Sequence, residues 1–164
     1  MPMLPSPHIM RYMEKCNLIN HLCDIIPEDS TFELRVTGYS MLPLLGYEQD
    51  RIVVKRVDDA FDIDNRIAMF RTKQGKIIVH RVVSVADDMV VMQGDGNLQG
   101  VEQCLRTEVI GVVDSVIRRS GKIVSCTSRT WRIRESIWLG FPHIVRRYTL
   151  ALLRRWLDRN KNKI

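Results

Sequence analysis

One serine and one histidine in this sequence have surroundings in which they could carry out chemistry. Ser40 lies in the segment Gly-Tyr-Ser-Met-Leu-Pro (residues 38–43), where Gly38 allows a tight turn. A hydroxyl at such a turn can cap its amides, or it can act as a nucleophile when a base removes its proton. As a nucleophile, Ser40 would be helped by the free amides of the turn, such as that of Met41, which could stabilise an oxyanion.

His80 is the candidate general base. It lies in the apolar run Ile-Ile-Val-His-Arg-Val-Val (residues 77–83), which predicts a buried strand. Alternation along a strand places His80 on one face and Arg81 on the other, and buried polar side chains need partners. His80 could also be a core histidine that bonds a main-chain carbonyl. Asp95, in the turn Gly-Asp-Gly-Asn (residues 94–97), could orient the imidazole as the third member of a triad, or it could be a solvated turn residue.

Short β-rich runs, separated by turn signals, predict the elements that would position these side chains. Runs at this spacing are typical of an antiparallel, mainly β domain. We therefore expect a β domain over residues 31–128, preceded by a helical segment over residues 1–30 with a helix at 8–25. The seven runs are residues 32–36, 51–57, 66–70, 76–85, 89–93, 108–117 and 122–126.

Residues 129–164 are predicted to form a basic amphipathic helical tail. Residues 118–164 contain 13 Lys and Arg against two acidic residues, whereas the whole chain has a net charge of only +6. Such a helix could pack on the β domain or on a second subunit. Through residues 138–157 it could also lie on an anionic membrane surface or bind a membrane partner, because Trp and Tyr accompany its arginines. One helical face carries Phe141, Ile144, Val145, Tyr148, Leu152 and Trp156.

Five short motifs occur in the order found in the signal peptidase I family, which shares its fold with the LexA-type and phage repressor peptidases. Residues 38–45 resemble the serine box of that family. Gly111 fits its closing strand, so the resemblance covers residues 34–117. The four later motifs lie at residues 49–54, 65–70, 78–83 and 93–97.

The sequence His80-Arg81-Val82 is similar to the archaeal and endoplasmic-reticulum types, which use a histidine base in place of lysine. The resemblance implies a serine endopeptidase that cleaves a leader or signal segment from a peptide or protein. It implies Ser40 as nucleophile, His80 as base and Asp95 as orienting acid, with an oxyanion hole at Ser40 and its neighbours. The family's further aspartate is missing after residue 97, and Glu102 could replace it.

The resemblance also implies the fold, which would be an antiparallel coiled sheet or partly open barrel. An N-terminal helix and a C-terminal amphipathic helix would accompany it. Gly38 stands where the lysine-type enzymes place an oxyanion serine, so no side-chain donor is expected there.

Other functions fit parts of the sequence. The chain could be a catalytically idle β module that its basic helix tethers to a membrane or a partner. A LexA-type self-cleaving regulator would need a DNA-binding module, but only 39 residues precede Ser40 and no Ala-Gly cleavage pair is found there. Nucleic-acid binding by the tail is disfavoured by its many large apolar residues.

No cofactor or metal is expected, because the four cysteines form no metal-binding or disulfide pattern. The longest apolar runs fall short of the ~18 residues that a transmembrane helix needs, and the N-terminus does not resemble a signal peptide. We therefore expect a cytoplasmic protein with reduced thiols, which could also be peripheral at the inner face of the membrane.

Overall fold

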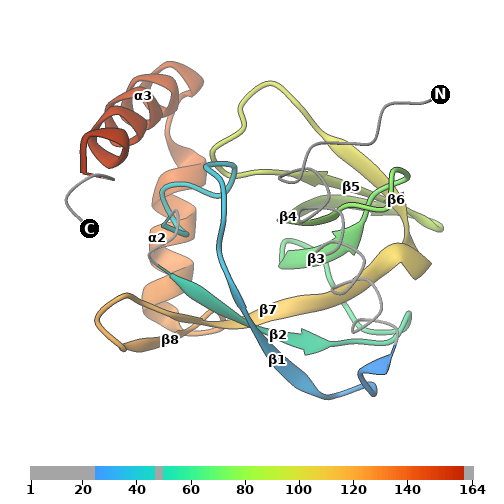
Figure 1. The fold of residues 1–164 in the computed structure, drawn as a ribbon. Coiled ribbons are helices and arrows are strands. Elements are labelled where there is room, and N and C mark those ends of the chain that lie inside the picture. Colours follow the sequence, from blue (N-terminus) through green and yellow to red (C-terminus); the bar gives the residue numbers. More distant parts are fainter. Residues whose placement is uncertain (1–24, 47–49, 161–164) are drawn as a thin grey trace, which may run out of the picture.

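The computed structural model describes residues 25–46 and 50–160 (Figure 1). The predicted helix at residues 8–25 therefore lies almost wholly outside the described residues. Two helices, α2 (Arg129–Gly140) and α3 (His143–Asn160), follow the strands. The strands are β1 (Thr31–Arg35), β2 (Arg51–Arg56), β3 (Ile67–Arg71), β4 (Ile77–Ala86), β5 (Met89–Gln93), β6 (Glu102–Leu105), β7 (Val109–Ile117) and β8 (Ile123–Ser125).

All the strands belong to one antiparallel sheet, whose order is β1-β2-β7-β3-β4-β5-β6, with β8 paired to β7. The path from β1 to β6 does not close into a barrel. The prediction of a mainly β, antiparallel fold is confirmed. Strand β6 was not among the predicted runs, and this omission matters for the site.

Alternating burial explains how the sheet is packed on both faces. In β3, Ile67 and Met69 belong to one hydrophobic cluster, whereas Ala68 and Phe70 belong to a second one. This strand is therefore buried on both sides, as its continuous apolar run requires. Register shifts in the pairs β2–β7, β3–β7 and β4–β5 add local bends to the sheet.

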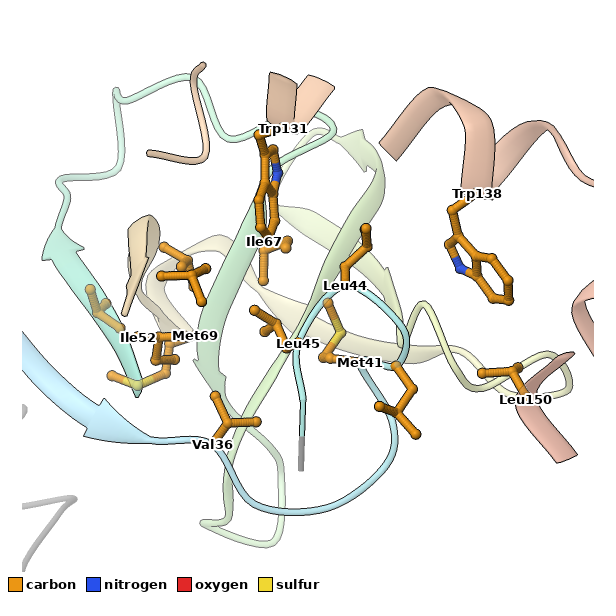
Figure 2. Packing of buried hydrophobic residues seen from close by; sticks show 14 of the residues in the cluster. Val36, Met41, Leu44, Leu45, Ile52, Ile67, Met69, Trp131, Trp138 and Leu150 are labelled. Carbon is orange, nitrogen blue, oxygen red and sulfur yellow. The ribbon is translucent and has the colours of Figure 1, made fainter. Parts of the chain in front are cut away.

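Helix α2 closes the first cluster. Its N-cap is Ser128, whose hydroxyl accepts a hydrogen bond from the amide of Trp131. Trp131 and Trp138 lie seven residues apart, on one face of the helix, and both are buried in this cluster. Figure 2 shows Trp131 near Ile67 and Trp138 further along, on the side of Leu150.

The tail forms two helices rather than the one helix expected from its periodicity. Helix α2 ends at Gly140, and α3 begins after Pro142, whose ring fits only the start of a helix. Leu150 and Leu157 of α3 are buried, whereas the predicted apolar face that includes Tyr148 and Leu152 is exposed. Among the described helices, none is both long enough and apolar enough to span a bilayer.

Candidate active site

Ser40 lies on a turn that apolar side chains hold in place. The chain leaves β1 and turns at Gly38, which has a φ of +85°. The amide of Leu45 donates to the carbonyl of Met41 at 3.0 Å, and the Leu42-Pro43 peptide is cis. Met41 and Leu45 are buried and point into the first cluster (Figure 2). The core therefore fixes the backbone around a half-buried serine.

The first two amides of this turn, those of Ser40 and Met41, remain available for a ligand. Among the described residues, the Ser40 hydroxyl accepts no hydrogen bond from a turn amide, so it does not act as a helix cap here. Likewise, within the described ranges, the amides of Ser40 and Met41 donate to no acceptor. A hydroxyl with two free amides beside it is the arrangement that a nucleophile with an oxyanion hole needs.

His80 is buried in β4, opposite Ala68, with 3% of its surface exposed. Its Nδ1 lies 2.7 Å from Oε2 of Glu102. An ionised carboxylate can only accept a hydrogen bond, so Nδ1 carries the proton of this contact and Nε2 is left for another partner. The imidazole is thereby held by Glu102 with Nε2 directed away from the carboxylate.

The serine turn, strand β4 and the loop after β5 meet at Gly94. A Cβ at Gly94 would overlap the carbonyl oxygen of Ser40 and would lie 3.1 Å from Nε2 of His80. The amide of Gly96 donates to the same Ser40 carbonyl at 2.7 Å. Nε2 of His80 and the carbonyl of Ser40 thus both lie close to Gly94. No hydrogen bond joins the Ser40 hydroxyl to the imidazole among the residues that the structure describes.

Asp95 does not contact the imidazole. Both of its carboxylate oxygens accept hydrogen bonds from Arg81, each at 2.8 Å, and its exposed fraction is 2%. His80 and Arg81 are neighbours on a strand and point to opposite faces, so an acid that binds Arg81 lies on the wrong side for His80. The acid beside the imidazole is Glu102, which corrects the expectation for Asp95.

The sheet register explains why Glu102 reaches the imidazole. Val82 pairs with Met92, and Met92 pairs with Glu102, so these three residues share one face of the sheet. His80 precedes Val82 by two positions and lies on that face as well. Glu102 was recognised in the sequence only as a substitute for a missing aspartate, because the strand that carries it was not predicted.

Arg81 organises the opposite side of β4. Its guanidinium binds Asp95, the carbonyl of Asn65 and, at 2.9 Å, the carboxylate of Glu135 on α2. Burial alone would lower the pKa of Arg81, but the hydrogen bond and charge of Asp95, together with Glu135, raise this pKa above its ordinary value. The loop that backs Ser40 is thus fixed to both β4 and α2.

A cavity of about 250 Å³ opens next to Ser40. It lies between the end of β1 and the first residues of β4. Residues 77–79 of β4 pair with β3 on one side, while β5 joins β4 only from Arg81 onward. Among the described strands, none pairs with the other edge of β4 at residues 77–79, which borders the cavity, and an extended peptide could pair with it. The apolar lining includes Leu34, Val36, Met41, Met69, Ile77 and Val79.

Cysteine does not compete with Ser40 as a nucleophile among the described residues. Burial, with the charge of Glu108, raises the pKa of Cys104 to about 11. Burial, with the charges of Glu135 and Asp114, raises the pKa of Cys126 to about 12. Both thiols are therefore protonated and unreactive near neutral pH. Within the described part of the chain, no group of three or more His, Cys, Asp or Glu side chains could hold a metal ion.

Neither the known protein-family models nor the curated protein sequences include a match to this chain.

Proposed function

We propose that this protein is a serine endopeptidase with Ser40 as nucleophile, His80 as general base and Glu102 as the acid that orients the base. The observation that carries the proposal is the contact between Nδ1 of His80 and Glu102 at 2.7 Å, which directs Nε2 to the side of Ser40 and Gly94. A buried imidazole that a carboxylate orients in this way is suited, in its neutral form, to take a proton from a serine hydroxyl.

The reaction would follow the steps of an acyl-enzyme mechanism. Nε2 of His80 accepts the proton of the Ser40 hydroxyl as Oγ attacks the peptide carbonyl, and the amides of Ser40 and Met41 stabilise the oxyanion. The Glu102 carboxylate stabilises the imidazolium that forms. His80 then gives its proton to the leaving amine. A water molecule, deprotonated by His80, hydrolyses the acyl-enzyme and restores the serine.

The substrate would be an extended segment, such as a leader or signal sequence, bound in the cavity beside Ser40. Its main chain would pair with the free edge of β4 at residues 77–79, and its side chains would enter the apolar lining. The resemblance to the signal peptidase family favours small side chains next to the scissile bond. It also favours the signal peptidase and LexA-type fold as the finer assignment of the open antiparallel sheet.

The test is to incubate the full chain with a library of unstructured peptides and to identify products by mass spectrometry. We expect Ser40→Ala and His80→Ala each to abolish cleavage. Ser120→Ala and His143→Ala are matched controls, because these exposed residues lie outside the site, and both should retain activity. Equal cleavage by the wild type and the Ser40 and His80 variants would exclude the proposal.

A catalytically idle binding module is the second candidate, since the Ser40 hydroxyl is not bonded to His80 within the described residues. In that case the wild type would bind extended peptides in the cavity without cleaving them. A fluorophosphonate probe distinguishes the two candidates, because only an activated serine forms the covalent adduct. Intact mass should show one adduct on the wild type and none on the Ser40→Ala or His80→Ala variants.

A further inference from the structure

An apolar stripe on α3 faces solvent. Ile144, Tyr148, Leu152 and Trp156 follow one another at four-residue steps, and their exposed fractions are 62%, 67%, 68% and 58%. These four residues are called the α3 stripe below. Val145 and Phe141 extend it with 41% and 43% exposed. This much contiguous apolar surface marks an interaction site.

The inner face of α3 has different partners. Leu150 and Leu157 are buried in the first cluster. Arg146 donates to the carbonyl of Asp95 at 3.1 Å, and Arg154 donates to the carbonyl of Gly96 at 2.7 Å. These contacts fix the rotation of the helix, so the α3 stripe cannot turn inward without breaking them.

The inner face also reaches the serine turn. The hydroxyl of Tyr39, the residue before Ser40, donates to Asp158 of α3. The loop that Arg146 and Arg154 bind is the loop whose Gly96 amide holds the Ser40 carbonyl. One side of α3 therefore supports the candidate active site, and the other side carries the exposed stripe.

The charges around the stripe indicate what covers it. The two acidic residues of α2 and α3 are engaged elsewhere, Glu135 with Arg81 and Asp158 with Tyr39. Arg147 and Arg155 each precede a stripe residue, and both are exposed. A second copy packed on the stripe would bring these arginines close to one another, and their like charges would repel. An anionic bilayer satisfies both features, because its headgroups attract arginine while its interface accepts Trp, Tyr and aliphatic side chains.

We propose that the α3 stripe docks this protein on an anionic phospholipid membrane. The helix would lie in the plane of the interface, with Leu152 and Trp156 among the acyl chains and Arg147 and Arg155 at the phosphates. Membrane binding is independent of catalysis. A further consequence, the delivery of the serine turn to a leader peptide at the bilayer surface, rests on the proposed function.

The experiment is co-sedimentation of the full chain with vesicles of phosphatidylglycerol and phosphatidylcholine, and with vesicles of phosphatidylcholine alone. We expect binding to the anionic vesicles that weakens as salt is added. Leu152→Glu should lower partitioning at least tenfold, or about 1.4 kcal/mol, because a charge replaces an apolar side chain that would enter the acyl region. Ile123→Glu is the matched control, because Ile123 on β8 has 67% exposed against 68% for Leu152. It should bind as the wild type does.

The outcomes separate this proposal from its competitors. Equal vesicle binding by the wild type and Leu152→Glu would overturn the proposal, provided that circular dichroism shows Leu152→Glu and Ile123→Glu to be folded. So would binding to neutral vesicles that salt does not change. A dimer in light scattering that Leu152→Glu dissociates, with no vesicle binding, would assign the stripe to a second copy. Ser40→Ala should bind vesicles as the wild type does, so a failure of the peptidase proposal leaves this result intact.

Discussion

The imidazole of His80 and the carboxylate of Glu102 are in contact at 2.7 Å, although 22 positions separate them in the chain. The contact crosses from β4 to β6 over the intervening strand β5, so it depends on the register of both strand pairs. It assigns the proton to Nδ1 of His80, and it leaves Asp95 to a different partner.

Glu102→Gln tests this contact directly. The amide can still lie against the imidazole, but it carries no charge to stabilise the imidazolium and can present its NH₂ to the wrong tautomer. We expect kcat to fall by about 10²- to 10⁴-fold with little change in KM. The pH profile of kcat should shift as well. A variant with the wild-type rate and pH profile would remove Glu102 from the mechanism.

Asp95→Asn should act on stability first. The substitution leaves Arg81 as a buried cation with one fewer carboxylate, and breaking such a pair costs about 3–5 kcal/mol in the free energy of unfolding. Urea denaturation measures this cost. The double variant Arg81→Met/Asp95→Leu removes both charges and should recover much of the loss. If Asp95→Asn is as stable as the wild type, the pair does not hold the loop.

Gly94→Ala should disturb the site by overpacking. The added methyl would overlap the Ser40 carbonyl and press on the imidazole of His80, so the serine turn has to move. We expect a stability loss of about 1–3 kcal/mol and a larger relative loss of kcat. In Gly140→Ala the methyl meets open space, which makes it the control. Full activity of Gly94→Ala would contradict the close approach seen here.

The thiols of Cys104 and Cys126 should be slow to alkylate in the folded protein. Their pKa values are raised from 9.0 to about 11 and about 12, so the thiolate fraction of Cys104 at pH 8 falls about 100-fold. Because the folded state favours the neutral thiols, their contribution to stability is complete below pH 9 and is lost as the pH rises towards these values. Peptide mapping after iodoacetamide treatment, with and without denaturant, measures the rates. Equal rates in both conditions would contradict the burial.

Much of the fold followed from local patterns. Strand β3 is continuously apolar, and β2 contains a run of β-branched residues, Ile52, Val53 and Val54, so both were recognisable without a partner strand. Strand β6 has only four residues, with Cys104 alone buried, and it forms because β5 offers it an edge. A strand that depends on its partner leaves no signal of its own, so the sequence predicts no strand at Glu102.

The sequence by itself determined which side chains could do chemistry and that the tail is helical and basic. It also indicated that Arg81, a charge in an apolar run, requires a partner. Only the tertiary structure decided that Asp95 is this partner and that Glu102 faces His80, because cross-strand register sets which residues share a face. It also decided which side of α3 faces outward. The helix has apolar residues on two sides, and the carbonyls of Asp95 and Gly96, which bind its arginines, select the inner one.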